Sequence, residues 1–329
     1  MQESYNSEHK LFIRGNWSER LLKFLSKRID TKLIYLGLPS PSAEDILQWI
    51  NYIKLVIAFQ CRVYGEMSDS SQDRTCVEEL DKILLQLEKD NKIETYLLFD
   101  GYLEEVILRG YDNSPKRINF ELTKFITLYN LDFCNKITSP LEFINQNGDL
   151  EKVYKFNAIN KLLQIQKSLS TISDKFVFSL TVHCSYDGEE LYNFINDPPD
   201  SEVAEYIKKY NSLTGYQKNS RIVRLFVTYL MRQYSNTFSF NIKTLPTILY
   251  KGLGDTYLLH FTMFGRSVEN TAGGIPSYQS MKEILDQKFI TVENSEFINI
   301  NDSVQDELDV EIDPIKCFVE SLTYKKMWL

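Results

Sequence analysis

The sequence predicts an α/β fold: a doubly wound, mainly parallel sheet that ends in an antiparallel hairpin and carries helices on both faces. The first observation is that apolar, β-branched and aromatic runs alternate with helical patterns, the runs falling at residues 32–38, 54–60, 93–99, 125–133 and 175–184. Strands that alternate with helices pair in parallel through right-handed crossovers. The second observation is that two later β-rich runs, 237–250 and 256–264, are joined by five turn residues and no helix, which predicts a hairpin.

The composition is that of a globular, acidic protein. Of 329 residues, 43% are hydrophobic, which is enough for a large packed core. The net charge of −8 argues against a broad surface for nucleic acid or anionic membrane and leaves open only a local basic groove. Five scattered cysteines form no CxxC pair, so we expect reduced thiols and no metal site. No stretch resembles a signal peptide or a membrane-spanning helix, and we expect a cytoplasmic protein.

Residues 32–45, KLIYLGLPSPSAED, change abruptly from an apolar run to turn residues and then to a helical pattern. Residues 32–38 predict a short buried strand, Gly37 and two prolines end it, and a helical pattern opens at Ser42. In an open α/β sheet this turn is where a nucleotide-like ligand binds, because the helix N-terminus offers unpaired N–H groups. An ordinary connection without a ligand is the alternative, because a single glycine is a weak fingerprint.

Amphipathic patterns place the helices between the strands. Apolar residues recur at helical spacing in residues 17–27, 42–53, 75–89, 154–169 and 201–234, the last broken near 213–218, and a short helix is expected to begin near Tyr102.

The chain after the hairpin no longer shows the regular alternation of strands and helices. It predicts a helix at 278–286, a strand at 289–294 and an acidic, solvated segment at 301–313. We therefore divide the chain into an N-terminal helical lead-in (1–31), a main α/β domain (32–266) and a C-terminal α+β extension (267–329).

Five strands alternating with helices, then a long helix and a terminal antiparallel hairpin, form a layout that resembles the class I S-adenosylmethionine-dependent methyltransferases, a Rossmann-like family. The resemblance covers roughly residues 32–266 and rests on topology more than on motifs. It implies S-adenosylmethionine as cofactor. The cofactor-binding positions that it implies follow the first, second and third strands, at Gly37, Leu38, Pro39, Ser40, Gln60, Asp100 and Gly101.

The end of the fourth strand, Asn130-Leu131-Asp132-Phe133, corresponds to the place where amino-group methyltransferases of this family carry Asn/Asp-Pro-Pro-aromatic. The resemblance implies that Asn130 positions the acceptor, that Phe133 presents an aromatic face to it, and that Asp132 is the candidate general base. A generic cluster of polar residues at a strand end is the alternative. The sequence does not indicate which molecule accepts the methyl group.

Three departures from the family pattern favour a different class of function. The first loop has one glycine, Gln60 stands where the family commonly has an acidic residue for the ribose hydroxyls, and both prolines of the acceptor motif are missing. The alternative is a catalytically degenerate methyltransferase-like module that binds a protein or nucleic-acid partner, with the aromatic and acidic region after Arg266 as a contact surface. The Asn-, Lys-, Ile- and Tyr-rich composition also suggests an accessory protein of an antiviral, phage-defence system. An open cavity above Gly37 and Asp132 favours the enzyme, and a loop plugged by its prolines favours the binding module.

The histidines indicate no separate chemistry. His260 lies in an apolar run and is expected to be buried with its ring nitrogens satisfied. His183 and Cys184 are neighbours at the end of the fifth strand, where adjacent side chains point to opposite faces, so a Cys–His nucleophile pair is not expected. The sequence contains no Walker-type phosphate loop, HExxH or GxSxG motif.

Overall fold

The computed structural model describes residues 7–29, 32–61, 76–133, 135–144, 148–171, 174–185, 188–252, 254, 256–268, 279–300 and 312–321. Most of the predicted acidic segment 301–313 lies outside the described residues, as does much of the region after Arg266, which is the contact surface of the binding-module alternative. No helix in the described part of the chain has both the length and the apolar character needed to cross a membrane.

The strands form one ten-stranded sheet and a separate two-stranded hairpin. In chain order the strands are β1 (Leu33–Gly37), β2 (Ile53–Gln60), β3 (Thr95–Asp100), β4 (Leu128–Asp132), β5 (Leu141–Ile144), β6 (Leu150–Val153), β7 (Lys175–His183), β8 (Phe240–Thr244), β9 (Thr247–Lys251), β10 (Tyr257–Ser267), β11 (Phe289–Glu293) and β12 (Glu296–Asn299). The sheet order is β12-β11-β9-β10-β7-β4-β1-β2-β3, and β8 also pairs with β10.

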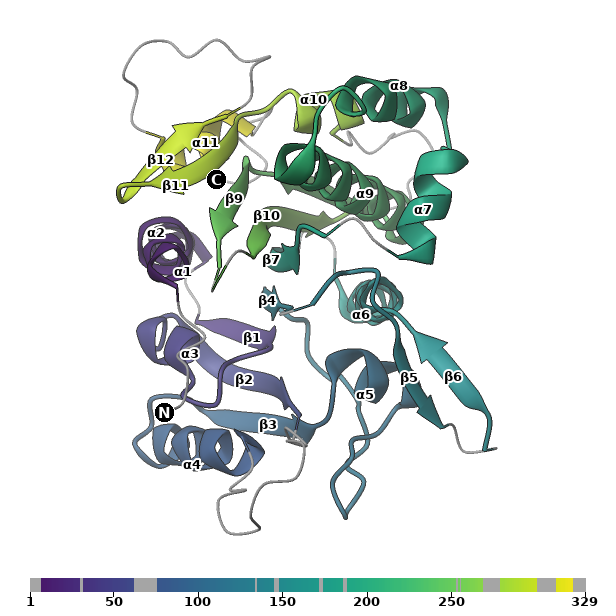
Figure 1. Ribbon diagram of the computed structural model, residues 1–329. Helices are drawn as coiled ribbons and strands as arrows, with labels where there is room; N and C mark the ends of the chain where they lie inside the picture. Colours follow the sequence, from purple (N-terminus) through teal and green to yellow (C-terminus); the bar gives the residue numbers. More distant parts are fainter. Residues whose placement is uncertain are drawn as a thin grey trace.

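The pairing confirms the predicted fold class. Strands β3, β2, β1, β4 and β7 pair in parallel, whereas β10 runs antiparallel to β7 and β9 (Figure 1). Strand β10 is also antiparallel to β8. Strand β10 therefore lies between β7 and β9 as the antiparallel member of the predicted hairpin. The β5–β6 hairpin is an addition that was not predicted from the sequence.

The helical segments are α1 (Glu8–Ile13), η1 (Arg14–Glu19, a π-helix), α2 (Arg20–Ile29), α3 (Glu44–Gln48), α4 (Cys76–Lys89), α5 (Leu103–Arg109), α6 (Lys155–Leu169), α7 (Glu189–Asn196), α8 (Ser201–Tyr210), α9 (Gly215–Phe238), α10 (Met281–Leu285) and α11 (Pro314–Ser321). The predicted break within 201–234 is present as the turn between α8 and α9.

Two predicted helix boundaries are wrong. The first helix begins at Glu8, ahead of the predicted start at Trp17, because the Ser7 hydroxyl caps it by accepting the Lys10 backbone N–H at 3.2 Å. The helix predicted over 42–53 is confined to α3, which follows Ala43 in the left-handed conformation (φ 51°). Its short length follows from the turns after Gln48 that lead into β2.

Helices cover both faces of the sheet, as predicted. One face packs against α5, α6, α9 and their neighbours, and the other against the N-terminal helices, α3, α4 and α11 (Figure 1). Alternate strand residues divide between the two cores: Tyr35 belongs to the second core, whereas Ile34 and Leu36 belong to the first. The N-terminal helices thus cover the face to which Tyr35 points.

Candidate functional site

A cavity of about 330 Å³ opens at the carboxyl ends of the parallel strands. Its wall includes eight of the residues expected at the site, namely Leu38, Pro39, Ser40, Gln60, Gly101, Asn130, Asp132 and Phe133. The prolines after β1 line the cavity and do not fill it. In an open α/β sheet this edge is the usual ligand site, because the connections leave a crevice where the strand order reverses. Here the reversal lies at β1, between β2 and β4.

Two of the expected residues are not part of the cavity wall. A Cβ atom on Gly37 would lie 2.5 Å from the backbone oxygen of Asn130 and 2.5 Å from the Tyr35 hydroxyl. Glycine at this position therefore allows β1 and β4 to lie close together. Asp100 is buried beside the following turn, where its N–H donates to the Asp112 carboxylate at 3.2 Å.

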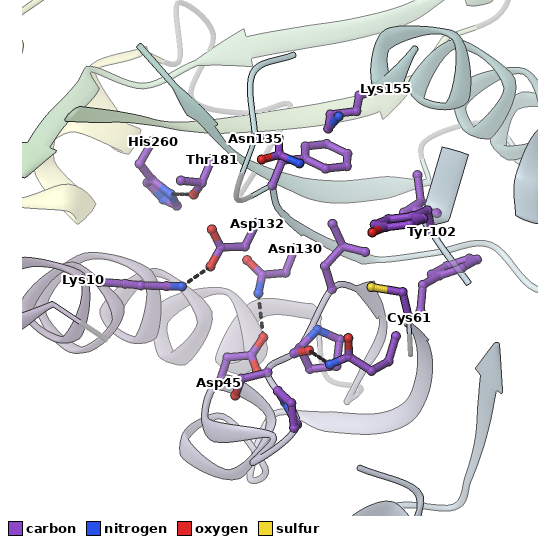
Figure 2. Close-up of a pocket in the computed structure, with 18 of the residues that line it drawn as sticks. Lys10, Asp45, Cys61, Tyr102, Asn130, Asp132, Asn135, Lys155, Thr181 and His260 are labelled. Carbon is purple, nitrogen blue, oxygen red and sulfur yellow. Dashed lines mark hydrogen bonds and ion pairs between the residues drawn. The ribbon is translucent and has the colours of Figure 1, made fainter. Parts of the chain in front are cut away.

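A buried polar network lies beneath the loop after β1. The Tyr35 hydroxyl and the Asn130 side-chain amide both donate to Asp45 Oδ2, at 2.7 and 2.6 Å. Figure 2 shows the contact between Asn130 and Asp45. Asp45 is 5% exposed, and burial followed by the Asp45 charge raises the pKa of Tyr35 well above its ordinary value. The Asn130 amide, expected to position an acceptor, is thus engaged by the α3 carboxylate.

Gln60 holds the loop after β1 in place. Its Nε2 donates to the Pro39 carbonyl at 3.2 Å, so the amide group that follows β2 contacts the loop that follows β1. Its carbonyl oxygen is the group that suits a hydroxyl donor, which is the chemistry expected at this position.

Asp132 forms an ion pair with the N-terminal helix. Lys10 Nζ lies 2.5 Å from Asp132 Oδ2, and each side chain is 20% exposed (Figure 2). Lys10 could not be predicted from the sequence, because a lysine in a polar N-terminal segment carries no local sign of a contact 122 positions away. Ile13, Arg14 and Ser18 bring the same helical region to the cavity wall.

Asp132 also begins a row of polar residues across three strands. In the sheet register Asp132 pairs with Thr181 of β7, and Thr181 pairs with His260 of β10. The Thr181 hydroxyl lies 3.0 Å from His260 Nδ1, and the Thr262 hydroxyl lies 3.2 Å from Nε2. Burial lowers the pKa of His260 to about 4, so the ring is neutral at pH 7. The prediction of a buried, satisfied His260 is confirmed, and its position on the cavity wall was not foreseen.

A second ion pair lies at the opposite part of the wall. Lys155, the first residue of α6, lies 3.3 Å from the Glu104 carboxylate of α5, and both side chains are buried. The Lys155 ammonium also lies 5.7 Å from the centre of the Phe133 ring, within the range of a cation–π contact. Tyr102 and Cys61 complete this part of the wall (Figure 2).

Metal chemistry finds no support in the described part of the chain, which contains no group of three or more His, Cys, Asp or Glu side chains placed to hold an ion. His183 is turned toward Ser185, whose hydroxyl lies 2.6 Å from its Nδ1, and it is not on the cavity wall.

Comparisons with known proteins find no matching family model and no matching curated protein. Among solved structures, Trm5b from Pyrococcus abyssi has a TM-score of 0.39 and 10% identity over 79% of this chain and 50% of its own. TYW2 from M. jannaschii, in complex with AdoMet, has a TM-score of 0.36 and 9% identity over 81% of this chain and 80% of its own. The N-methyltransferase NodS from Bradyrhizobium japonicum has a TM-score of 0.34 and 8% identity over 78% and 88% of the two chains.

The chain spans half the length of Trm5b. At these identities and TM-scores the similar structures do not by themselves establish the fold. The fold follows from the topology of the sheet. Four parallel pairings join β3, β2, β1, β4 and β7, and the antiparallel β10 separates β7 from β9. This is the arrangement that the resemblance implied, and the chain has a class I methyltransferase-like fold.

Proposed function

We propose that the cavity binds S-adenosylmethionine and that the protein is a methyltransferase. The observation that carries the proposal is the position of the cavity, which lies at the carboxyl ends of β1, β2 and β4 where the strand order reverses. It is lined by the loops that the resemblance assigns to cofactor and acceptor.

The residues present fit the cofactor in chemistry. Leu38, Phe59 and Tyr102 supply apolar and aromatic surface for a flat purine, and the Gln60 carbonyl suits a ribose hydroxyl. The carboxylates of Asp45 and Asp132 favour a positively charged sulfonium group. When bound, the cofactor supplies an activated methyl group on a good leaving group.

The protein's own part is then positioning and proton handling. Asn130 and Phe133 orient the acceptor, and Ile13 and Ser18 of the N-terminal helical region form part of the cavity wall. Asp132 would hold the proton that an acceptor loses, because its carboxylate lies on the wall and its neighbour His260 is neutral.

One observation favours a second function, a degenerate module that binds a partner. Three polar groups expected at the site already have partners within the chain: Gln60 with the Pro39 carbonyl, Asn130 with Asp45, and Asp132 with Lys10. A site of this kind keeps its fold without a cofactor.

Calorimetric titration with S-adenosylmethionine and S-adenosylhomocysteine distinguishes the two. We expect micromolar binding and a rise in Tm with ligand concentration. Ser40→Trp should abolish binding because Ser40 lines the cavity, whereas Ser212→Trp, at an exposed position away from it, should not. Gly37 is unsuitable for a blocking variant, because any side chain there would collide with Asn130. Absence of heat together with an unchanged Tm at high ligand concentration would reject the methyltransferase and favour the binding module.

A further inference from the structure

The Lys10–Asp132 ion pair places an alkylammonium group at the carboxylate expected to act on the acceptor. Asp132 ends β4, the strand whose end is the expected acceptor site, and its Oδ2 lies 2.5 Å from Lys10 Nζ. Both residues line the cavity. The contact therefore shows which kind of chemical group this position accommodates.

The charges around Asp132 favour a cation at this point. Within the described residues, the ion pair at Asp132 is made by Lys10, while Lys155 pairs with Glu104 at 3.3 Å. The register partner Thr181 is neutral, and His260 beyond it is neutral at pH 7. A carboxylate that is four-fifths buried is costly without a cation, so an anionic or neutral group that replaced Lys10 would leave Asp132 unfavourably placed.

Lys10 can leave this position without movement of its helix. The helical region is anchored independently, by Arg14 to Glu44 at 3.3 Å, by the Trp17 indole N–H to Thr262 at 3.1 Å, and by the Gln48 amide to Glu19 at 2.8 Å. The lysine side chain is a flexible four-carbon stem, so a change of rotamer withdraws the ammonium from the carboxylate. A ligand with the same charge can then take its place.

We propose that Asp132 is an ammonium-recognition point, which the Lys10 ammonium occupies in this structure, and that the methyl acceptor is a cationic primary alkylamine that displaces Lys10. The acceptor assignment rests on the proposed methyltransferase function, whereas the ammonium site does not. In the reaction the amine nitrogen gives a proton to Asp132, its lone pair forms the new N–C bond, and the C–S bond breaks with its electrons remaining on sulfur. The charge of the sulfonium thereby passes to the methylated ammonium.

The test uses Lys10→Met in the full chain, which removes the ammonium and retains the length of the side chain. We expect a lower Tm than in the wild type, and a recovery of several degrees on addition of n-butylammonium chloride beyond that given by sodium chloride at equal ionic strength. Lys161→Met, which removes an exposed lysine of α6, is the matched control and should respond as the wild type does. Should Lys10→Met fail to fold, Lys10→Gln retains a hydrogen-bond donor toward Asp132 and replaces it in the same assay.

The double variant Lys10→Met/Asp132→Asn should show no recovery specific to the amine. An equal recovery in the double variant, or a recovery matched by n-butanol or sodium chloride, would overturn the ammonium site.

Titration of S-adenosylmethionine into the same proteins tests the methyltransferase separately. If it does not bind while the amine does, the ammonium site stands and the acceptor assignment fails. If both bind, we expect N-methylbutylamine by mass spectrometry, and its absence would overturn the alkylamine as acceptor.

Discussion

Asn130 Nδ2 donates to Asp45 Oδ2 across 2.6 Å, and this hydrogen bond joins the end of β4 to the first turn of α3. The same oxygen accepts the Tyr35 hydroxyl at 2.7 Å. The Asp45 carboxylate therefore holds both the Tyr35 hydroxyl and the Asn130 side-chain amide in place. The network explains how a loop with a single glycine keeps a defined position beside the cavity.

Asp45→Ala should lower the free energy of unfolding by about 2–4 kcal/mol, because it leaves a phenol and an amide without their charged acceptor. Urea denaturation measures the change. Tyr35→Phe, which removes one donor and no charge, should cost about 1 kcal/mol. The two substitutions should be less than additive in the double variant, since they remove the same hydrogen bond. Full additivity would mean that Asp45 acts through other contacts.

Gly37 and Gly15 should respond to alanine with opposite signs. Gly37→Ala places a Cβ 2.5 Å from the backbone of β4, and separation of the strands should cost at least about 2 kcal/mol. At Gly15 the nearest heavy atom to a new Cβ is 3.4 Å away, and alanine should stabilise the helical region by about 0.5–1 kcal/mol. Thermal and urea unfolding of both variants test the pair. A stable Gly37→Ala protein would contradict the packing role assigned to this glycine.

His260 makes stability depend on pH. Burial lowers its pKa from the ordinary 6.5 to about 4 in the folded protein, so between these values the unfolded chain binds a proton that the folded chain does not. Stability from this group is therefore complete above pH 6.5 and is lost as the pH falls toward 4, by about 3 kcal/mol in total. His260→Gln should flatten this part of the curve of unfolding free energy against pH. An unchanged slope in the variant would assign the acid sensitivity to other groups.

The fold could be predicted because its signals are local. Continuous apolar runs, turn residues and helical periodicity lie within short windows, and the alternation of strand and helix restricts the topology. The β5–β6 hairpin was missed because its strands are four residues each, and in β6 the pattern is mostly exposed.

The site could be predicted only in part. The predicted strand ends place Leu38, Gln60 and Asp132 at one edge of the sheet. The residues that contact them come from segments distant in sequence. Lys10 reaches the site because its helix packs across the sheet, and His260 reaches it through the register of β10 with β7. Neither relationship has a local sequence signal. Gly37 has a packing constraint that the sequence does not reveal, since a glycine required by the neighbouring strand looks the same in sequence as one required by a ligand.

Substitution of the buried pair Lys155–Glu104 should lower the free energy of unfolding mainly through the charge that is left without its partner. Lys155→Met leaves the Glu104 carboxylate buried without its cation, and we expect a loss of about 3–5 kcal/mol in the free energy of unfolding. Lys155→Met combined with Glu104→Gln removes both charges, so much of the loss should be recovered. Lys161→Met, at an exposed position on the same helix, should change stability by less than about 0.5 kcal/mol. If the double variant is no more stable than Lys155→Met alone, the cost comes from the lost cation–π contact with Phe133 and not from the unpaired charge.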